Sequence, residues 1–482
     1  MSNGKRLHPT AIIFKLMYSI KNAIYVAIPP LIASFGNDFF FWVIIGVGVL
    51  FLLFVLYSVV DWLRFTYAVV DDELRIHQGI FIRNKRSISK HRIQSIDLTQ
   101  GVLHRIFKLT KVSIETAGSN QGVDAALSSV TFEEGKAVQD ALKSKGPVVE
   151  TEEEQQEEPD YPKKSVTNKE LVIAGSTSGS IGVILGLMLL GFSEVERFIP
   201  ESAYDEATRW ILALAIEAIL GLVIFFLVIL WGLGILGTVI KYGRFTITRY
   251  EDELFITRGL LEKKQMTIPL KRIQAVGIKE SLIRQPLGFA SVYVEIAGGE
   301  VKAGSRTLLF PIIKKANVEQ FLHEILPEYQ EVPTEFTKLP TRALPYYIIS
   351  MVFLPAIITV AVGIFLTDFI YLPIILAIAA VLFAILKHRT HGSHISEQQI
   401  TFVTRDFSKD TILVKHKRIQ SFEKRQHFLQ RKQNLATVRI SMLNNFAGRH
   451  ESVSGFELED ADHLSDWYSL RKRAIPNNSD EN

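Results

Sequence analysis

The chain has 482 residues, and its high hydrophobic content of 48% is concentrated in long uncharged stretches. Such stretches are typical of a membrane protein rather than a soluble one. The absence of cysteine excludes disulfides, thiolate nucleophiles and cysteine-based metal centres. The net charge of +4, from 54 basic and 50 acidic residues, is too small to indicate nucleic acid as a partner.

Six stretches are long and apolar enough to cross a bilayer core of about 30 Å as helices. They come in three close pairs, which predicts three transmembrane hairpins. A buried core helix is the alternative for each stretch, but such a helix normally stops well short of this length. The stretches cover about residues 19–35 and 39–60, 171–192 and 214–240, and 345–366 and 369–386.

Basic residues gather at one end of every hairpin. Lys15, Arg64, Lys241 and Lys387 are examples, whereas the opposite side offers few basic residues and several acidic ones near residues 194–209. Since cytoplasmic loops carry the excess of Lys and Arg, we expect both termini and all large loops in the cytoplasm. Glycines inside two stretches predict close helix packing, because glycine lets backbones approach in lipid. These are Gly175, Gly179, Gly182 and Gly186 in the third stretch and Gly232, Gly234 and Gly237 in the fourth.

A short basic motif recurs three times, once after each hairpin. The copies are His91–Ser95, Lys271–Ala275 and Lys417–Ser421, and each contains Arg-Ile-Gln. Twenty residues beyond each arginine stands a valine, at Val112, Val292 and Val438. The same motif at the same offset after three hairpins indicates an internal threefold repeat.

Each repeat contains a β-rich region followed by one helix. Phe65 to Val70 and Leu74 to Ile76 flank Asp71-Asp72, which predicts a β-hairpin. Thr131 and Glu134 have the spacing of a capping box and predict a helix start. The first two copies share Gly79 and Gly259, but the third has Arg405 at that place and has therefore diverged.

These observations divide the chain into eight segments. Residues 147–168 are acidic and contain proline, which predicts a disordered linker. The segments are hairpin 1 (1–60), module 1 (61–146), the linker (147–168), hairpin 2 (169–241), module 2 (242–330), hairpin 3 (331–387), module 3 (388–474) and a disordered tail (475–482).

With Arg64-Phe65-Thr66, Arg244-Phe245-Thr246 and the three Arg-Ile-Gln cores, the chain resembles the bacterial pleckstrin-homology-like family of multipass membrane proteins from bacilli. The resemblance is to the long members with three modules, and it covers nearly the whole chain. It implies modules of about seven strands in two packed sheets, closed by a C-terminal helix. The expected fold is thus an α+β membrane protein in the bacterial plasma membrane, with six helices in three hairpins, each followed by a cytoplasmic PH-like sandwich or barrel. Some membrane-bound members are associated with envelope stress and resistance to antimicrobial peptides, so the resemblance implies such a role.

The basic cores are the candidate binding residues: His91, Arg92, Lys271, Arg272, Lys417 and Arg418. One interpretation is structural, with each arginine paired to a carboxylate of its own module, such as Glu115, Glu295 or Glu423. A second is contact with anionic lipid head groups, because Lys and Arg near such lipid are attracted by about 1 kcal/mol each. Docking of a partner protein is the third.

Three histidines, His388, His391 and His394, follow the sixth stretch at spacings of three. On one helical face they would suit zinc binding or pH sensing. Gly392 argues against a continuing helix, so we expect them to fill the membrane boundary instead. We expect no metal site, no cofactor and no catalytic residue, since no phosphate-binding, nucleophile-elbow or metalloprotease motif is present.

Two hypotheses for function follow. The first is a non-enzymatic scaffold in the lipid bilayer whose modules bind a membrane-protein partner, anionic lipid head groups or another copy of the chain. The second is a transporter or exporter whose six helices form a path. The spans show almost no ionisable residues at mid-depth, which favours the scaffold.

Overall fold

The computed structural model describes residues 4–116, 125–142, 161–177, 209–297, 306–365, 369–442 and 449–470. The predicted third span beyond residue 177, the linker before residue 161 and the predicted tail lie outside these ranges. The chain forms two compact units. Unit 1 contains Met1–Tyr161 and Thr248–Leu270, and unit 2 contains Pro162–Ile247, Lys271–Ala297 and Ala303–Asn482.

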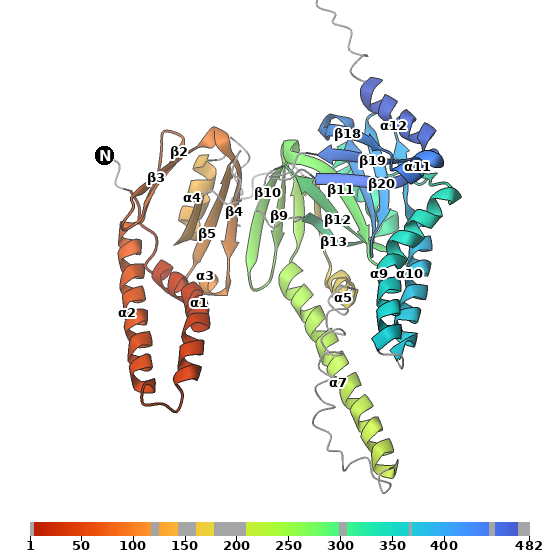
Figure 1. Ribbon diagram of the computed structural model, residues 1–482. Helices are drawn as coiled ribbons and strands as arrows, with labels where there is room; N and C mark the ends of the chain where they lie inside the picture. The colour runs from red at the N-terminus through yellow and green to blue at the C-terminus, as the bar shows by residue number, and fades with distance from the viewer. Residues whose placement is uncertain are drawn as a thin grey trace, which may run out of the picture. The chain divides into compact units, whose positions relative to one another are not determined.

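Two pairs of long helices, α1 with α2 and α9 with α10, precede the first and third β-rich regions, and the long helix α7 precedes the second (Figure 1). Four of them, over Phe40–Arg64, Ile224–Tyr242, Thr341–Phe365 and Tyr371–Thr390, are long and apolar enough to cross a membrane. Their apolar side chains stay largely exposed, as expected for helices in lipid. The helices are α1 (Thr10–Ser34), α2 (Phe40–Arg64), α5 (Asn168–Ser176), α7 (Arg209–Tyr242), α9 (Leu344–Phe365) and α10 (Tyr371–Thr390).

The glycine predictions have different outcomes in α5 and α7. A Cβ atom on Gly175 would lie 2.8 Å from the Cα of Ile235, so this glycine does allow two helices to approach closely. Gly232 and Gly237 have no other described atom within 4 Å of such a position, so the described residues do not show the packing predicted for them. Gly179, Gly182 and Gly186 lie outside the described residues.

Module 1, in unit 1, is built of two three-stranded antiparallel sheets that face each other. Asp71 and Asp72 have positive φ angles of 55° and 58° and form the predicted hairpin turn. Leu74, Val112 and Ile114 are fully buried between the sheets, and Thr131 caps the closing helix. The elements are β1 (Thr66–Val70), β2 (Glu73–Gln78), β3 (Asn84–Ser89), β4 (Ile93–Gln100), α3 (Val102–Ile106), β5 (Leu109–Thr116), β6 (Ala125–Thr131) and α4 (Phe132–Leu142).

Module 3, in unit 2, repeats this plan, with Phe402, Val438 and Phe456 at the centre of its core. A short strand before its hairpin, β14 (Thr337–Lys338), adds to the edge of β15. The elements are β15 (Gly392–Ile395), β16 (Gln399–Arg405), β17 (Lys409–Lys415), β18 (Ile419–Arg425), α11 (Phe428–Lys432), β19 (Leu435–Met442), β20 (Arg449–Glu457) and α12 (Leu458–Leu470).

Module 2 contributes to both units, β9 and β10 to the first and the following strands to the second. Lys163–Ser165, inside the predicted linker, is the short strand β7. The elements of module 2 are β8 (Thr246–Arg249), β9 (Glu253–Arg258), β10 (Lys263–Pro269), β11 (Ile273–Glu280), β12 (Phe289–Ile296), β13 (Thr307–Lys314) and α8 (Val318–Ile325).

Sheets continue from one module into the next. In unit 1, β10 of module 2 pairs antiparallel with β4 of module 1. In unit 2, β17 of module 3 pairs antiparallel with β11 of module 2. We call these pairings junction 1 and junction 2. The repeat predicted three modules, and backbone hydrogen bonding between strand edges joins each module to the next.

Candidate functional site

All three basic cores lie on the same element, a short 3₁₀ turn between the third and fourth strands of a module. The turns are η1 (Lys90–Arg92), η5 (Leu270–Arg272) and η10 (His416–Arg418). The side chains of His91, Arg92, Lys271 and Lys417 are exposed, whereas Arg272 and Arg418 are half-buried.

The two half-buried arginines contact their surroundings in unit 2. Arg272 donates from Nε to the carbonyl oxygen of Ala297 over 2.8 Å, and the Ala297 amide donates back to the Arg272 carbonyl. Burial raises the pKa of the Tyr329 hydroxyl, and the guanidinium of Arg418 close to it opposes that shift. Arg272 therefore fastens the turn to the end of β12 through the backbone of Ala297.

The carboxylates proposed as partners of these arginines make other contacts. Ser95 donates to Glu115 over 2.8 Å, Arg306 donates to Glu295 over 3.1 Å, and Arg425 donates to Glu423 over 2.5 Å. Arg306 is the more buried of the two arginines among these donors, and it was not among the residues that the sequence indicated.

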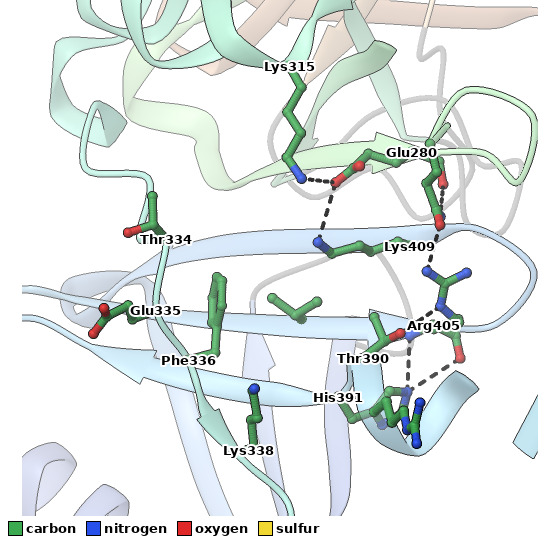
Figure 2. A pocket seen from close by; sticks show the side chains of 13 residues that line it. Glu280, Lys315, Thr334, Glu335, Phe336, Lys338, Thr390, His391, Arg405 and Lys409 are labelled. Carbon is green, nitrogen blue, oxygen red and sulfur yellow. Dashed lines mark hydrogen bonds and ion pairs between the residues drawn. The ribbon is translucent and has the colours of Figure 1, made fainter. Parts of the chain in front are cut away.

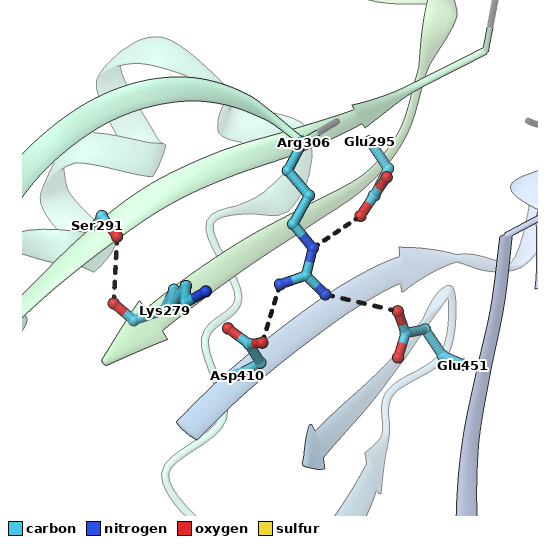
Figure 3. A network of polar contacts seen from close by, with 6 residues as sticks. All are labelled: Lys279, Ser291, Glu295, Arg306, Asp410 and Glu451. Atoms are coloured by element: carbon cyan, nitrogen blue, oxygen red, sulfur yellow. Dashed lines mark hydrogen bonds and ion pairs between the residues drawn. The ribbon is translucent and has the colours of Figure 1, made fainter. Parts of the chain in front are cut away.

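Arg306 lies at the centre of a charged cluster at junction 2, which Figure 3 shows. Its guanidinium lies 3.1 Å from Glu295 on β12, 2.9 Å from Asp410 on β17 and 3.9 Å from Glu451 on β20. The Glu295 side chain is only 7% exposed and that of Asp410 only 15%. A single cation thus lies close to three largely buried carboxylates from three strands, two of which belong to module 3.

The ring of Tyr293 supports this cluster from β12. The guanidinium carbon of Arg306 lies 4.3 Å from the ring centre, within the range of a cation–π contact. A Cβ atom on Gly277 would lie only 2.0 Å from Cζ of Tyr293, so the ring occupies the space that this glycine leaves empty. Burial, with the nearby carboxylate of Asp410, raises the pKa of the Tyr293 hydroxyl, and the phenol therefore stays neutral.

A basic hollow of about 710 Å³ opens beside junction 2 (Figure 2). Glu280 is 5% exposed and lies 3.4 Å from Lys315 and 3.6 Å from Lys409. Burial lowers the pKa of the Lys409 ammonium, which Glu280 opposes. Lys338 and Arg389 add further positive charge to the lining. Strand pairing places Glu280 directly opposite Lys409, so this ion pair belongs to the junction itself.

Arg405, which the sequence indicated only as a divergence, is a buried link in this hollow. It is 3% exposed and donates from Nε to Thr390 over 2.8 Å and from Nη2 to Gln285 over 2.7 Å. Thr390 is the last residue of α10. The arginine therefore connects the end of a membrane helix with modules 2 and 3.

A second arginine, Arg284, makes the corresponding connection to α5. It donates to the hydroxyl of Thr177 over 2.9 Å and to the carbonyl oxygens of Ala174 and Pro311 over 3.2 and 3.0 Å. Because α5 packs on α7, these bonds connect both helices to module 2.

The three histidines, His388 in the last turn of α10 and His391 and His394 after it, make separate contacts. His388 bonds to the carbonyl oxygen of Pro340 over 3.0 Å, and His394 packs edge-on against Phe336. His391 is buried between Tyr347, at 2.9 Å, and the backbone amide of Arg405, at 3.0 Å. Within the described ranges, no group of three or more His, Asp or Glu side chains is placed to hold a metal ion. The helix ends at Thr390, as Gly392 predicted.

Because the Arg405 amide donates to Nε2 of His391, that nitrogen carries no proton. The other nitrogen, Nδ1, then donates to the Tyr347 hydroxyl, which itself donates to the Ser454 carbonyl over 2.7 Å. Burial lowers the pKa of His391 to about 4, so the ring is neutral at physiological pH.

Comparison with known proteins places the chain among bacterial membrane proteins. The bacterial PH domain family matches it three times, at residues 24–145, 209–329 and 344–472. A transmembrane protein of Bacillus subtilis, UPF0699 transmembrane protein YdbT, is 34% identical over 490 residues, which cover 98% of this chain and 99% of that protein. The repeated β modules, the apolar helices and these matches together show that the chain belongs to the family of bacterial PH domain membrane proteins with three modules.

Proposed function

We propose that this protein is a non-enzymatic scaffold of the bacterial plasma membrane. In this proposal, six helices in three hairpins hold the three modules at the cytoplasmic surface, where they present a binding surface to a membrane-protein partner. The observation that carries the proposal is junction 2, where β11 pairs with β17 and Arg306 joins carboxylates of both modules. A scaffold can hold its partners at fixed positions only if its own modules are fixed to one another.

The chemistry of the charged groups supports this role. The cluster of Arg306, Glu295 and Asp410 is closed on itself, because each carboxylate already contacts the guanidinium. Such a cluster holds the strands that carry it in one relative position. The arginines at the membrane boundary, Arg284 and Arg405, likewise fix the hairpins to the modules.

The cytoplasmic placement of the modules rests on the basic residues beside the spans. Arg64 ends α2, Lys241 lies in the last turn of α7, and Lys387 and Arg389 lie in the last turn of α10. These ends all lead into β modules, and the rule that basic residues stay inside then assigns the modules to the cytoplasm. Protection of the cell envelope against antimicrobial peptides is the physiological role that we propose for the scaffold.

Affinity purification in mild detergent, followed by mass spectrometry, tests the proposal. Wild-type protein should retain a membrane-protein partner, and the Arg306→Ala variant should lose it because its modules are no longer held together. Arg342→Ala, which removes an exposed pair with Glu457, is the matched control and should retain the partner. Purified protein that moves a solute across liposomes without any partner would instead favour a transporter.

A further inference from the structure

The two junctions use one register. Gln100 and Glu280 each stand eight residues after the core arginine of their module, and Lys263 and Lys409 each stand nine residues before it. At junction 1, Lys263 is opposite Gln100, and at junction 2, Lys409 is opposite Glu280. Equivalent residues are therefore paired at both places. At both junctions, the fourth strand of one module pairs with the third strand of the next module in the same register.

With this pairing, one third strand and one fourth strand have no partner in another module among the described strands. β3 of module 1 is the outer strand of the sheet β1-β2-β3, and β18 of module 3 is the outer strand of the sheet β18-β19-β20. Four successive residues of β3, Asn84 to Ser87, are exposed. In β18, Gln420, Ser421, Lys424 and Arg425 are exposed, whereas the equivalent part of β11 is buried by its junction.

We propose that β18 of one copy of this protein pairs with β3 of a second copy, in the register of the two internal junctions. The inference names the partner of the scaffold proposed above and rests on that function. Because the two edges differ, the contact is head-to-tail and continues from copy to copy, giving rows or rings rather than closed two-fold dimers. Main-chain hydrogen bonds between edge strands are a known source of such association.

The register predicts which residues meet. Ser421 would lie opposite Ile88, Glu423 opposite Arg86 and Arg425 opposite Asn84 of the second copy. The pair Glu423 and Arg86 has opposite charges, as Lys279 and Asp410 have at junction 2. Directly opposed residues of opposite charge stabilise antiparallel strand pairs. The carbonyl of Gln420, which accepts a bond from Tyr468, lies just outside the paired stretch.

Lysine and arginine on β3 also allow a second interpretation, because proteins place such residues on edge strands to prevent pairing. Junction 1 argues against it here. β10 begins with Lys263 and Lys264, yet both residues are paired with β4. Basic residues on this edge therefore do not block the pairing.

The membrane permits the association. In unit 2, the helices α7, α9 and α10 leave the β layer on the same side, although they belong to hairpins of different modules (Figure 1). Strand pairing at junction 2 thus leaves the long helices of modules 2 and 3 on one side of the β layer. A second copy joined by the same pairing would have its spans in the same bilayer.

Because the chain contains no cysteine, single cysteines report the contact cleanly. Two full-length proteins with different tags, Glu423→Cys and Arg86→Cys, would be produced together and oxidised in isolated membranes. We expect a disulfide-linked product that carries both tags, since directly opposed residues lie within disulfide reach. Each chain holds one cysteine, so this product arises only between copies.

Two controls make the result decisive. Thr99→Cys with Lys264→Cys in one chain spans junction 1 and should form a disulfide within the monomer. Arg83→Cys with Ser421→Cys is out of register by roughly 17 Å and should give at least about tenfold less product than the matched pair. No product from the matched pair, while the junction 1 control forms its disulfide, would overturn the proposal. Equal yields from the matched and shifted pairs would overturn it too.

Charge reversal gives a second test that needs no oxidation. Glu423→Arg should shift the protein toward smaller species in native mass spectrometry, and addition of Arg86→Glu should restore the larger ones. If the wild-type protein is already a single copy, self-association is excluded. Retention of a different membrane protein by that single copy would leave the scaffold function standing.

Discussion

Arg306 and Asp410 form an ion pair across junction 2, with 2.9 Å between Nη1 and Oδ2. Removal of the cation takes a positive charge away from three largely buried carboxylates. We therefore expect Arg306→Ala to lower the free energy of unfolding of unit 2 by about 2–4 kcal/mol. Thermal or denaturant unfolding of detergent-purified protein measures this. The exposed pair of Arg342 and Glu457 is the control, and its loss should cost about 0–1 kcal/mol.

Gly277 should tolerate no larger residue while Tyr293 is present. Gly277→Ala puts a methyl group where the ring lies, so the ring must move away from Arg306. We expect a loss of about 1–3 kcal/mol in unfolding free energy from this overpacking. In a double-mutant cycle with Tyr293→Leu, the two effects should be clearly non-additive. Gly237→Ala, where no described atom lies within 4 Å of the new methyl group, is the control and should leave stability unchanged.

Acid should weaken module 3 through His391. Its pKa is lowered to about 4 in the fold, while an ordinary histidine in the unfolded chain has a pKa of about 6.5. Below a pH of about 6.5, this histidine in the unfolded chain binds a proton that the native His391 ring does not bind. The contribution of His391 to the free energy of unfolding is therefore fully present at neutral pH and decreases as the pH falls toward 4. The slope approaches about 1.4 kcal/mol per pH unit.

Melting temperatures at pH 7.5 and pH 5 test this dependence. The wild-type protein should lose stability at the lower pH, because protonation of Nε2 breaks its bond with the Arg405 amide. His391→Gln cannot take up this proton and should show a smaller difference between the two pH values. His77→Gln, at an exposed position of β2, should behave like the wild type.

Substitutions in the basic cores should affect stability at the half-buried positions and not at the exposed ones. Arg272→Ala removes the bond to the Ala297 carbonyl and should cost about 1–2 kcal/mol in stability, with lower protein levels in cells. Arg92→Ala, at an exposed position, should leave levels unchanged. If exposed core residues touch lipid, Arg92→Ala should also reduce the stabilisation that anionic lipid gives in nanodiscs. Unchanged stabilisation would exclude that contact for Arg92.

Much of the fold can be predicted from local sequence. The turn at Asp71-Asp72, the cap at Thr131 and the strand containing Val112 are encoded by neighbours a few residues away. The repeat also predicts that each module has the same plan. Short-range chemistry of this kind leaves a pattern that a single sequence displays.

The contacts between modules leave no such pattern. Backbone hydrogen bonds at junction 2 do not depend on side-chain type, and Arg306 and Asp410 are 104 residues apart. From the sequence, Arg405 was interpreted only as a residue that replaces the glycine of the other two copies. Nothing in the sequence shows that Thr390 and Gln285 lie beside it. Complementary charges at Lys279-Glu280 and Lys409-Asp410 were the one signal that could have indicated the junction.

The shared register also has an evolutionary consequence. Each duplicated segment carries both kinds of strand edge, already complementary to those of its neighbours. The gene can therefore gain or lose a whole segment without any new contact having to arise, because the added copy fits at either end of the row.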